Sequence, residues 1–198
     1  MTDRTIASIV SLQRGNSYKS KLLGDEGPKL LGLGSIAKDG GFKGNDLKSY
    51  SGPTDPRHLL RPGDIYVSLK DVTQSGDLLG SIARVPDRIE LGRLTQDTVK
   101  LEFFDAQFSR PYLYWALRTP QYRAYCRAHA LGTTNLSLSR DDFLSFSLPP
   151  LTASRAALVD VLENIEAKIE VNRRMAATLE QMARALYRSW FVDFDPVT

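Results

Sequence analysis

A heptad repeat of apolar residues runs through the C-terminal part of the chain, from residue 154 to about residue 190. Its seam residues follow one another at alternating steps of four and three, which places them along one side of a coiled-coil helix. They are Leu158, Leu162, Ile165, Ile169, Asn172, Ala176, Leu179, Ala183, Leu186 and Trp190. The pattern predicts one uninterrupted helix of roughly 50 Å.

Such a seam requires a partner helix, because its apolar side chains would otherwise face water. The first 150 residues contain no second helical pattern of this length. We therefore expect the helix to act as a spacer and oligomerisation rod beside a separate domain. Asn172 is the one polar residue in the seam, and it either fixes register and partner choice or is tolerated beside a gap.

Shorter apolar segments separated by turn signals fill the first 150 residues. Residues 99–103 alternate most regularly and predict a strand. Strands are also expected in four other apolar runs. These are residues 5–12, for which a short helix followed by a strand is the alternative, and residues 65–69, 78–85 and 144–148. The fold class predicted is α+β, a sheet-rich domain followed by one long C-terminal coiled-coil helix.

Two short helices are expected between residues 111 and 131. Pro111 opens the first, Thr119 followed by Pro120 caps the second, and Gly132 is expected to end it. Pro149 and Pro150 then interrupt regular structure before the long helix, which Thr152 or Ser154 is expected to cap. The domain boundary therefore falls between residues 1–150 and residues 151–198.

A loose dinucleotide fingerprint occurs in the glycine-rich stretch of residues 24–51. Gly32, Gly34 and Ala37 match it, but the residues that follow, 38–41, include two glycines and cannot continue a helix. The fingerprint needs a strand before it and an amphipathic helix after it. A short strand followed by a glycine loop is therefore the preferred interpretation.

Composition favours one ordinary domain with an appendage. The chain has 198 residues, 42% of them hydrophobic, and one cysteine, which excludes an internal disulfide framework and fits a reducing compartment. No signal peptide follows the N-terminus, and no apolar run reaches membrane length. We expect a cytoplasmic protein with no membrane partner.

Positive charge is concentrated before the long helix. From residue 151 onward there are six Lys/Arg and seven Asp/Glu, which leaves 20 basic and 16 acidic residues in the first 150. This excess is compatible with a polyanionic partner, although many domains without such a partner carry as much charge.

The residue types of most catalytic sites are missing from the pattern. No nucleophile with a neighbouring base and no Walker loop is discernible, and one cysteine with two histidines cannot compose a metal site of the usual spacing. Glu166 and Lys168 resemble half of a nuclease motif but lie in the middle of the predicted helix. We therefore expect a protein that is not an enzyme and holds no metal.

Several segments together resemble the DNA specificity subunit of type I restriction–modification systems, which act in phage defence, and more narrowly a half-length form of it. They agree with that family in order and spacing and cover nearly the whole chain. They are residues 15–20 (GNSYKS), 62–65 (PGDI), 112–115 (YLYW), 131–139 (LGTTNLSLS), 148–151 (LPPL) and 179–196 (LEQMARALYRSWFVDFDP).

The resemblance implies a two-part architecture. Members of the family have two target-recognition domains joined by two long antiparallel helices; each domain reads half of a bipartite DNA site, and the helices set the gap. This chain has one domain and one helix, so an antiparallel homodimer would restore both and would read a gapped palindrome. The residues implied in dimerisation are Leu158, Leu162, Ile165, Ile169, Asn172, Leu179, Leu186 and Trp190.

The resemblance also implies double-stranded DNA, a methyltransferase subunit and a restriction subunit as partners. S-adenosylmethionine, ATP and magnesium would bind to those partner subunits, and this chain would bind no cofactor. Its DNA contacts are expected from polar loops, with Lys and Arg on phosphates. The candidates are Arg14, Ser17, Tyr18, Lys19, Lys21, Ser35, Lys38, Lys43, Lys70, Thr133, Thr134 and Asn135.

Two other functions fit the residues. The first is a coiled-coil adaptor whose domain binds protein and not DNA, which the modest net charge of +3 favours. The second is a metal-dependent nuclease that uses Glu166 and Lys168. An exposed loop without a function is also an adequate interpretation of residues 13–21.

Overall fold

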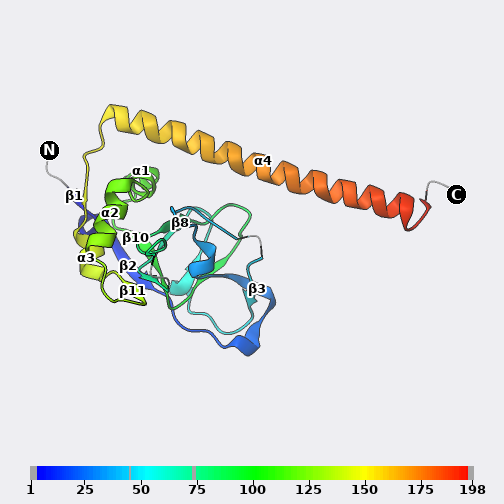
Figure 1. Cartoon of the computed structure of the whole chain (residues 1–198), viewed down its shortest axis with the longest axis horizontal. Helices are drawn as coiled ribbons and strands as arrows, with labels where there is room; N and C mark the ends of the chain where they lie inside the picture. Colours follow the sequence, from blue (N-terminus) through cyan, green and yellow to red (C-terminus); the bar gives the residue numbers. More distant parts are fainter. Residues whose placement is uncertain (1–3, 45, 73–74, 196–198) are drawn as a thin grey trace. The chain divides into compact units, whose positions relative to one another are not determined.

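The first unit of the chain is built on an antiparallel sheet whose central strand is the most regularly alternating segment. The computed structural model describes residues 4–44, 46–72 and 75–195. In this sheet the order is β2-β10-β6-β8; Figure 1 labels β2, β10 and β8. The strands are β2 (Val10–Arg14), β10 (Thr98–Phe103), β6 (Ile65–Ser68) and β8 (Ile82–Arg84). The strand expected at residues 99–103 is confirmed as β10.

A second sheet has the order β4-β3-β9-β5. Its strands are β4 (Ser49–Tyr50), β3 (Leu23–Leu31), β9 (Gly92–Leu94) and β5 (Leu59–Leu60). β3 and β9 run parallel, whereas the two outer pairs are antiparallel. The register between β3 and β4 shifts between Gly24 and Lys29, so the glycine-rich stretch forms a bulged strand.

Two small ladders tie distant segments together. β1 (Arg4–Thr5) pairs with β12 (Ser147–Leu148), and β7 (Lys70–Asp71) pairs with β11 (Leu136–Ser137). The first ladder joins the two ends of the unit Met1–Pro150, which clusters separately from Leu151–Thr198. Single 3-10 turns complete the connections. They are η1 (Ile6–Ser8), η2 (Ser20–Leu22), η3 (Leu33–Ser35) and η4 (Pro56–His58).

Three short helices follow β10, each with a hydroxyl N-cap. They are α1 (Arg110–Ala116), α2 (Pro120–Ala128) and α3 (Arg140–Ser145), and they gather near β1 (Figure 1). The caps are Ser109, Thr119 and Ser139, whose side chains each accept a hydrogen bond from a backbone N–H of the first turn. The cap expected at Thr119 is confirmed.

Both sheets contribute to one apolar core. Leu31 and Leu60 from the second sheet cluster with Tyr66, Ala83 and other residues of the first. The whole cluster is Leu31, Ile36, Leu60, Tyr66, Ala83, Val85, Ile89 and Leu94. Burial of these side chains against one another stabilises the packing of the two sheets.

Three local predictions were wrong at their boundaries. Residues 78–81 form a turn before β8, in which Gly80 has a φ of +70°. Residues 144–145 end α3, which the sequence pattern did not reveal, and only Ser147–Leu148 is a strand. The second helix ends at Ala128, before Gly132. In the first two cases a run of apolar residues was taken for a strand, whereas the apolar side chains belong to a turn or a short helix. In the third case the glycine lies four residues beyond the last helical residue.

The second unit is one helix, α4 (Ala153–Phe191), of 39 residues. Its N-cap is Thr152, whose hydroxyl accepts a hydrogen bond from the Arg155 N–H at 3.3 Å. Seam residues Leu158, Leu179 and Leu186 are 57%, 61% and 59% exposed. The long helix is therefore confirmed, with an apolar seam open to solvent. No described helix is long and apolar enough to cross a membrane.

The N-terminal residues Met1–Asp3, on which a missing signal peptide was judged, and the closing Pro196 lie outside the described residues.

Buried tyrosines should make the fold sensitive to alkali. The Tyr66 hydroxyl lies 2.8 Å from Ser35 Oγ, and burial raises its pKa well above the ordinary value; burial also raises the pKa of Tyr122. The folded state therefore keeps protons that the unfolded chain releases above about pH 10. Stability should be full below that pH and fall as the pH rises beyond it.

Tyr66→Phe tests this in denaturant titrations at about pH 8 and about pH 11. At the lower pH the variant should be less stable by about 1 kcal/mol, because one hydrogen bond is lost. At the higher pH the difference in stability between the variant and the unmodified protein should become smaller. The unmodified protein loses stability there because its unfolded state releases the Tyr66 proton, whereas phenylalanine has no proton to release. An equal difference in stability at both pH values would contradict the raised pKa of Tyr66.

Candidate nucleic-acid interface

The first polar loop leaves the central sheet at the end of β2. Arg14 is the last residue of β2, and Asn16 forms an isolated bridge with Thr95. A Cβ at Gly15 would collide with the Thr95 carbonyl oxygen and the Leu94 side chain, so only glycine allows this close approach. The loop is thereby held at its base, and its tip is presented to solvent. Arg14, Ser17, Tyr18, Lys19 and Lys21 are all exposed.

The turn between β9 and β10 brings two of the predicted loops together. Arg14 Nε donates to the carbonyl oxygen of Gln96 at 3.1 Å. Lys70 Nζ lies 3.4 Å from Asp97 Oδ1. Arg14 and Lys70 are 56 positions apart in the chain, yet they contact neighbouring residues of one turn.

The loop with Thr133, Thr134 and Asn135 joins the same surface. It leads directly into β11, whose Ser137 is the ladder partner of Lys70. Gly132 has a φ of +98° at the start of this loop, a conformation that a side chain would strain. All three predicted contact residues are exposed.

The loop with Lys38 is also attached to this surface. Lys38 Nζ lies 3.0 Å from Asp77 Oδ2, and Ser81 Oγ donates to the Lys38 carbonyl oxygen at 3.0 Å. The hydrogen bond from Lys38 lowers the pKa of Asp77, and the same contact raises the pKa of Lys38. Asp77 precedes Leu78, whose N–H donates to Asp71 of β7 at 2.7 Å. The contacts therefore run from Lys38 to the β7–β11 ladder.

These contacts divide the predicted cations into two groups. Lys38 and Lys70 each have a carboxylate partner, so their charge is partly neutralised. Lys19, Lys21 and Lys43 are exposed and have no ion pair among the residues that the structure describes. The unpaired cations are the better candidates for phosphate contacts.

Ser35 is a correction to the predicted set. Its side chain is 1% exposed, and its hydroxyl donates to the Gly32 carbonyl oxygen at 2.6 Å. It is also the partner of Tyr66 in the core. Ser35 supports the fold of its loop and does not present its hydroxyl to a ligand.

Three residues that form or support this surface were not singled out by the sequence pattern. Gln96 and Asp97 lie in the turn that Arg14 and Lys70 contact, and the polar triplet 95–97 before a regular strand could have indicated that turn. Arg93 is buried beneath Asn16. Its neighbours Gly92 and Leu94 in the sequence give no hint of this position.

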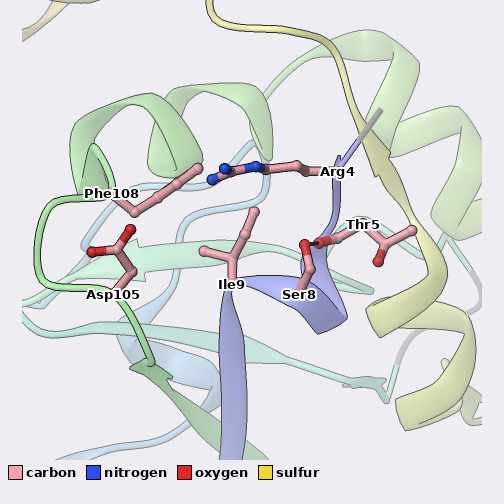
Figure 2. Close-up of a pocket in the computed structure, with 6 residues that line it drawn as sticks. All are labelled: Arg4, Thr5, Ser8, Ile9, Asp105 and Phe108. Carbon is pink, nitrogen blue, oxygen red and sulfur yellow. Dashed lines mark hydrogen bonds between the residues drawn. The ribbon is translucent and has the colours of Figure 1, made fainter. Parts of the chain in front are cut away.

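A pocket of about 460 Å³ lies elsewhere on the domain (Figure 2). Its lining residues come from β1, η1, the residue between η1 and β2, and the segment after β10. They are Arg4, Thr5, Ser8, Ile9, Asp105 and Phe108. Figure 2 shows Arg4 reaching above Ile9 toward Phe108. None of the predicted contact residues lines this pocket. Within the described ranges, no group of three or more His, Cys, Asp and Glu side chains could hold a metal ion.

The geometry is that of an extended polar surface. Four loops, distant in the sequence, are joined by short contacts, and their exposed side chains are hydroxyls, amides and ammonium groups. Such groups bind phosphate oxygens and base edges, whereas small-molecule sites are mostly apolar cavities.

Comparison with known proteins gives a partial sequence match. Over 54 residues, 27% of this chain, the sequence is 44% identical to the type I restriction enzyme HindI specificity subunit of Haemophilus influenzae. The match covers 12% of that protein. No family model matches the chain.

Solved structures match over almost the whole chain. The type I restriction–modification S subunit from M. genitalium matches 96% of this chain with a TM-score of 0.57 and 22% identity, over 48% of its own length. The HsdS subunit from Thermoanaerobacter tengcongensis matches 96% of this chain with a TM-score of 0.56 and 17% identity, over 44% of its length. A third structure, from a study of complex assembly in the type I system, gives the same TM-score over 44% of its length.

The chain thus spans about half the length of these structures and repeats their combination of a sheet-rich domain and a long helix. The resemblance drawn from the motifs is confirmed: the chain has the fold of about one half of a type I restriction–modification specificity subunit and is similar in sequence to part of one.

Proposed function

We propose that the chain is a half-length DNA specificity subunit of a type I restriction–modification system. The observation that carries this is a match along 95–96% of this chain to only 44–48% of the S-subunit structures. One recognition domain and one helix are present where those proteins have about twice the length. The exposed loops of the domain supply the chemistry for DNA contacts.

The missing half is supplied by a second copy. An antiparallel homodimer buries the open seam of α4 against an identical seam and restores two domains and two helices. Because a twofold axis relates the copies, the target is a palindrome with a gap. A helix of 39 residues is about 58 Å long and spans roughly 17 base pairs, which suits two separated half-sites.

The chain itself performs no catalysis in this proposal. It positions a methyltransferase subunit, which brings S-adenosylmethionine, and a restriction subunit, which brings ATP and magnesium. Affinity comes mainly from exposed Lys and Arg on phosphates, and sequence discrimination comes from the polar loop side chains.

The direct test is selection from a random pool of DNA duplexes with the methyltransferase subunit present. The expected product is an enriched gapped palindrome. A contiguous or asymmetric enriched site contradicts the homodimer, whereas absence of any enriched sequence contradicts the specificity role.

A coiled-coil adaptor without DNA binding is the second candidate. The observation that favours it is the pairing of Lys38 and Lys70 with carboxylates, which reduces the positive charge of the loops. Retention on DNA across a salt series separates the two, because phosphate contacts must release counterions. Binding that does not change with salt supports the adaptor.

DNA cleavage by the purified chain with magnesium alone would instead support the nuclease based on Glu166 and Lys168.

Asn172→Leu is expected to strengthen dimerisation roughly tenfold or more. In an antiparallel overlap of the seam from Leu158 to Trp190, the centre falls near residue 174, so Asn172 lies opposite Ala176 of the partner copy. Alanine leaves room for leucine, and burying leucine in place of a polar group stabilises the interface. Sedimentation across a concentration series measures the change.

Asn164→Leu, on the outer face of the same helix, is the control and should leave the dimer unchanged. Equal dissociation constants for Asn172→Leu and the unmodified chain would place Asn172 in solvent.

A further inference from the structure

An arginine lies buried directly beneath the first polar loop. Arg93 of β9 is 1% exposed. Its Nη2 donates to Asn16 Oδ1 at 2.6 Å and to the Ser17 carbonyl oxygen at 3.1 Å. These two acceptors belong to the loop that is predicted to contact DNA. The guanidinium therefore holds the loop from the side opposite to solvent.

The other contacts of Arg93 anchor it to the domain. Its Nε donates to Thr54 Oγ1 at 3.1 Å, and its Nη1 donates to the Leu94 carbonyl oxygen at 3.2 Å. The guanidinium carbon lies 4.6 Å from the centroid of the Tyr50 ring. Nε and Nη1 of the guanidinium thus bind Thr54 and Leu94, and Nη2 binds the loop.

The same cluster reaches Tyr18 through a ring contact. Tyr50, which the Arg93 guanidinium covers, meets Tyr18 edge to face at 6.2 Å between centroids. Tyr18 is 40% exposed, so one part of its ring packs and another part faces solvent. Asn16, Ser17 and Tyr18 are therefore all placed, directly or through Tyr50, by one buried side chain.

Burying the Arg93 guanidinium in this way costs free energy of folding. The four hydrogen-bond acceptors of Arg93 are neutral oxygens, and none is a carboxylate. Burial lowers its pKa, although an arginine stays charged in a protein. A buried charge without an opposite charge is unfavourable, and an apolar side chain would fill the space at lower cost. Stability of the domain alone gives no reason for a cation at this position.

We propose that Arg93 is the positioning residue of the recognition loop Asn16–Tyr18. It does not touch DNA, but it holds the loop in the conformation that reads DNA. This inference rests on the proposed function. Its consequence is that sequence discrimination depends on a residue behind the contact surface, because a preordered loop loses little conformational entropy on binding.

Arg93→Lys is the informative substitution because it separates charge from geometry. Lysine keeps the positive charge but has one ammonium group in place of a planar fork. A single ammonium group cannot donate hydrogen bonds to Thr54 and to both Asn16 and Ser17 at the same time. The loop should therefore be released.

Backbone 15N relaxation of the full chain without DNA gives the first measurement. In Arg93→Lys, the order parameters of residues 16–19 should fall, whereas those of β10 should be unchanged. The control is Val85→Ala, a core substitution at 1% exposure in the cluster shared by both sheets. It destabilises the domain without touching the loop, so it should lower the melting temperature and leave the order parameters of residues 16–19 unchanged.

Selection from a random duplex pool with the methyltransferase subunit gives the second measurement. Arg93→Lys should bind unselected DNA as the unmodified chain does, with the same salt slope, because Lys19 and Lys21 remain. Its preference for the enriched sequence should fall roughly tenfold or more, the scale of one lost base contact. Val85→Ala should keep its preference.

The outcomes separate the two proposals. Unchanged order parameters of residues 16–19 in Arg93→Lys overturn the positioning role, and so does an equal loss of preference in Val85→Ala. Enrichment of no sequence by the unmodified chain overturns the proposed function, and with it any role of Arg93 in reading DNA. In that case the relaxation data still show whether Arg93 holds the loop.

Discussion

Replacing Ile165 and Leu179 by aspartate is expected to convert the chain from a dimer to a monomer. Both residues belong to the seam of α4, and they are 50% and 61% exposed in the single chain. In the proposed dimer each lies against the partner helix. Two carboxylates per copy would then be buried without partners, at a cost of several kcal/mol. The dissociation constant should rise by at least roughly a thousandfold.

Mass in solution measures this effect, by sedimentation or light scattering over a range of concentrations. The matched control is the pair Asn164→Asp and Thr178→Asp, which adds the same charge on the outer face of α4, one residue before each seam position. It should remain dimeric. Circular dichroism of both variants tests whether the helix itself survives.

Two results would contradict the prediction that the seam of α4 is the dimer interface. Dissociation of the control to the same degree would mean that charge, and not burial, disrupts the assembly. A seam variant that stays dimeric would place the dimer interface outside the seam of α4. The monomer should also lose the gain in affinity that comes from binding two half-sites at once, while it keeps weak binding to any duplex.

Replacing Lys19 and Lys21 by glutamine is expected to weaken binding to every DNA sequence. Both lysines are exposed in the first loop, and no ion pair engages them among the described residues. If each contacts one phosphate, a dimer loses four contacts, and the slope of log K against log salt should decrease by about 3.6. At about 0.1 M salt this corresponds to roughly a thousandfold loss of affinity.

Lys168→Gln with Arg173→Gln is the matched control, because it removes the same charge from α4. It should change neither affinity nor salt slope by a comparable amount. A single Lys38→Gln substitution should have less effect than either loop lysine alone, since Asp77 already neutralises part of its charge. An unchanged slope in the loop variant would place Lys19 and Lys21 away from phosphates.

The helix was predictable because its signal is local. Seam positions repeat over many turns, so α4 could be placed within two residues at each end from spacing alone. The central strand β10 was predictable for the same reason. The short strands β4, β5 and β9 were not, because two or three residues carry no periodicity, and their strand conformation comes from the neighbours with which they pair.

The candidate site was predictable as a set of residue types but not as a surface. Polar segments with cations at residues 14–21, 38–43 and 70, and the uncharged polar loop at residues 133–135, stood out by composition. Ser35 was misjudged because a serine beside glycines reads as exposed, whereas this hydroxyl is bound to Gly32 and Tyr66 inside the domain. Asp77 and Asp97, which engage two of the predicted lysines, gave no signal, since ion pairs join residues that are distant in the chain.

The sequence by itself determined the long helix, its open seam, the domain boundary region and the family resemblance, because each depends on spacing within one stretch of chain. Only the tertiary structure decided which loops adjoin one another, which lysines are ion-paired, and that Arg93 lies under Asn16 and Ser17. The position of Arg93 depends on burial and on the pairing of β2 with β10, and both join positions more than 70 residues apart. The ion pairs of Lys38 and Lys70 depend on the folding of the loops against one another.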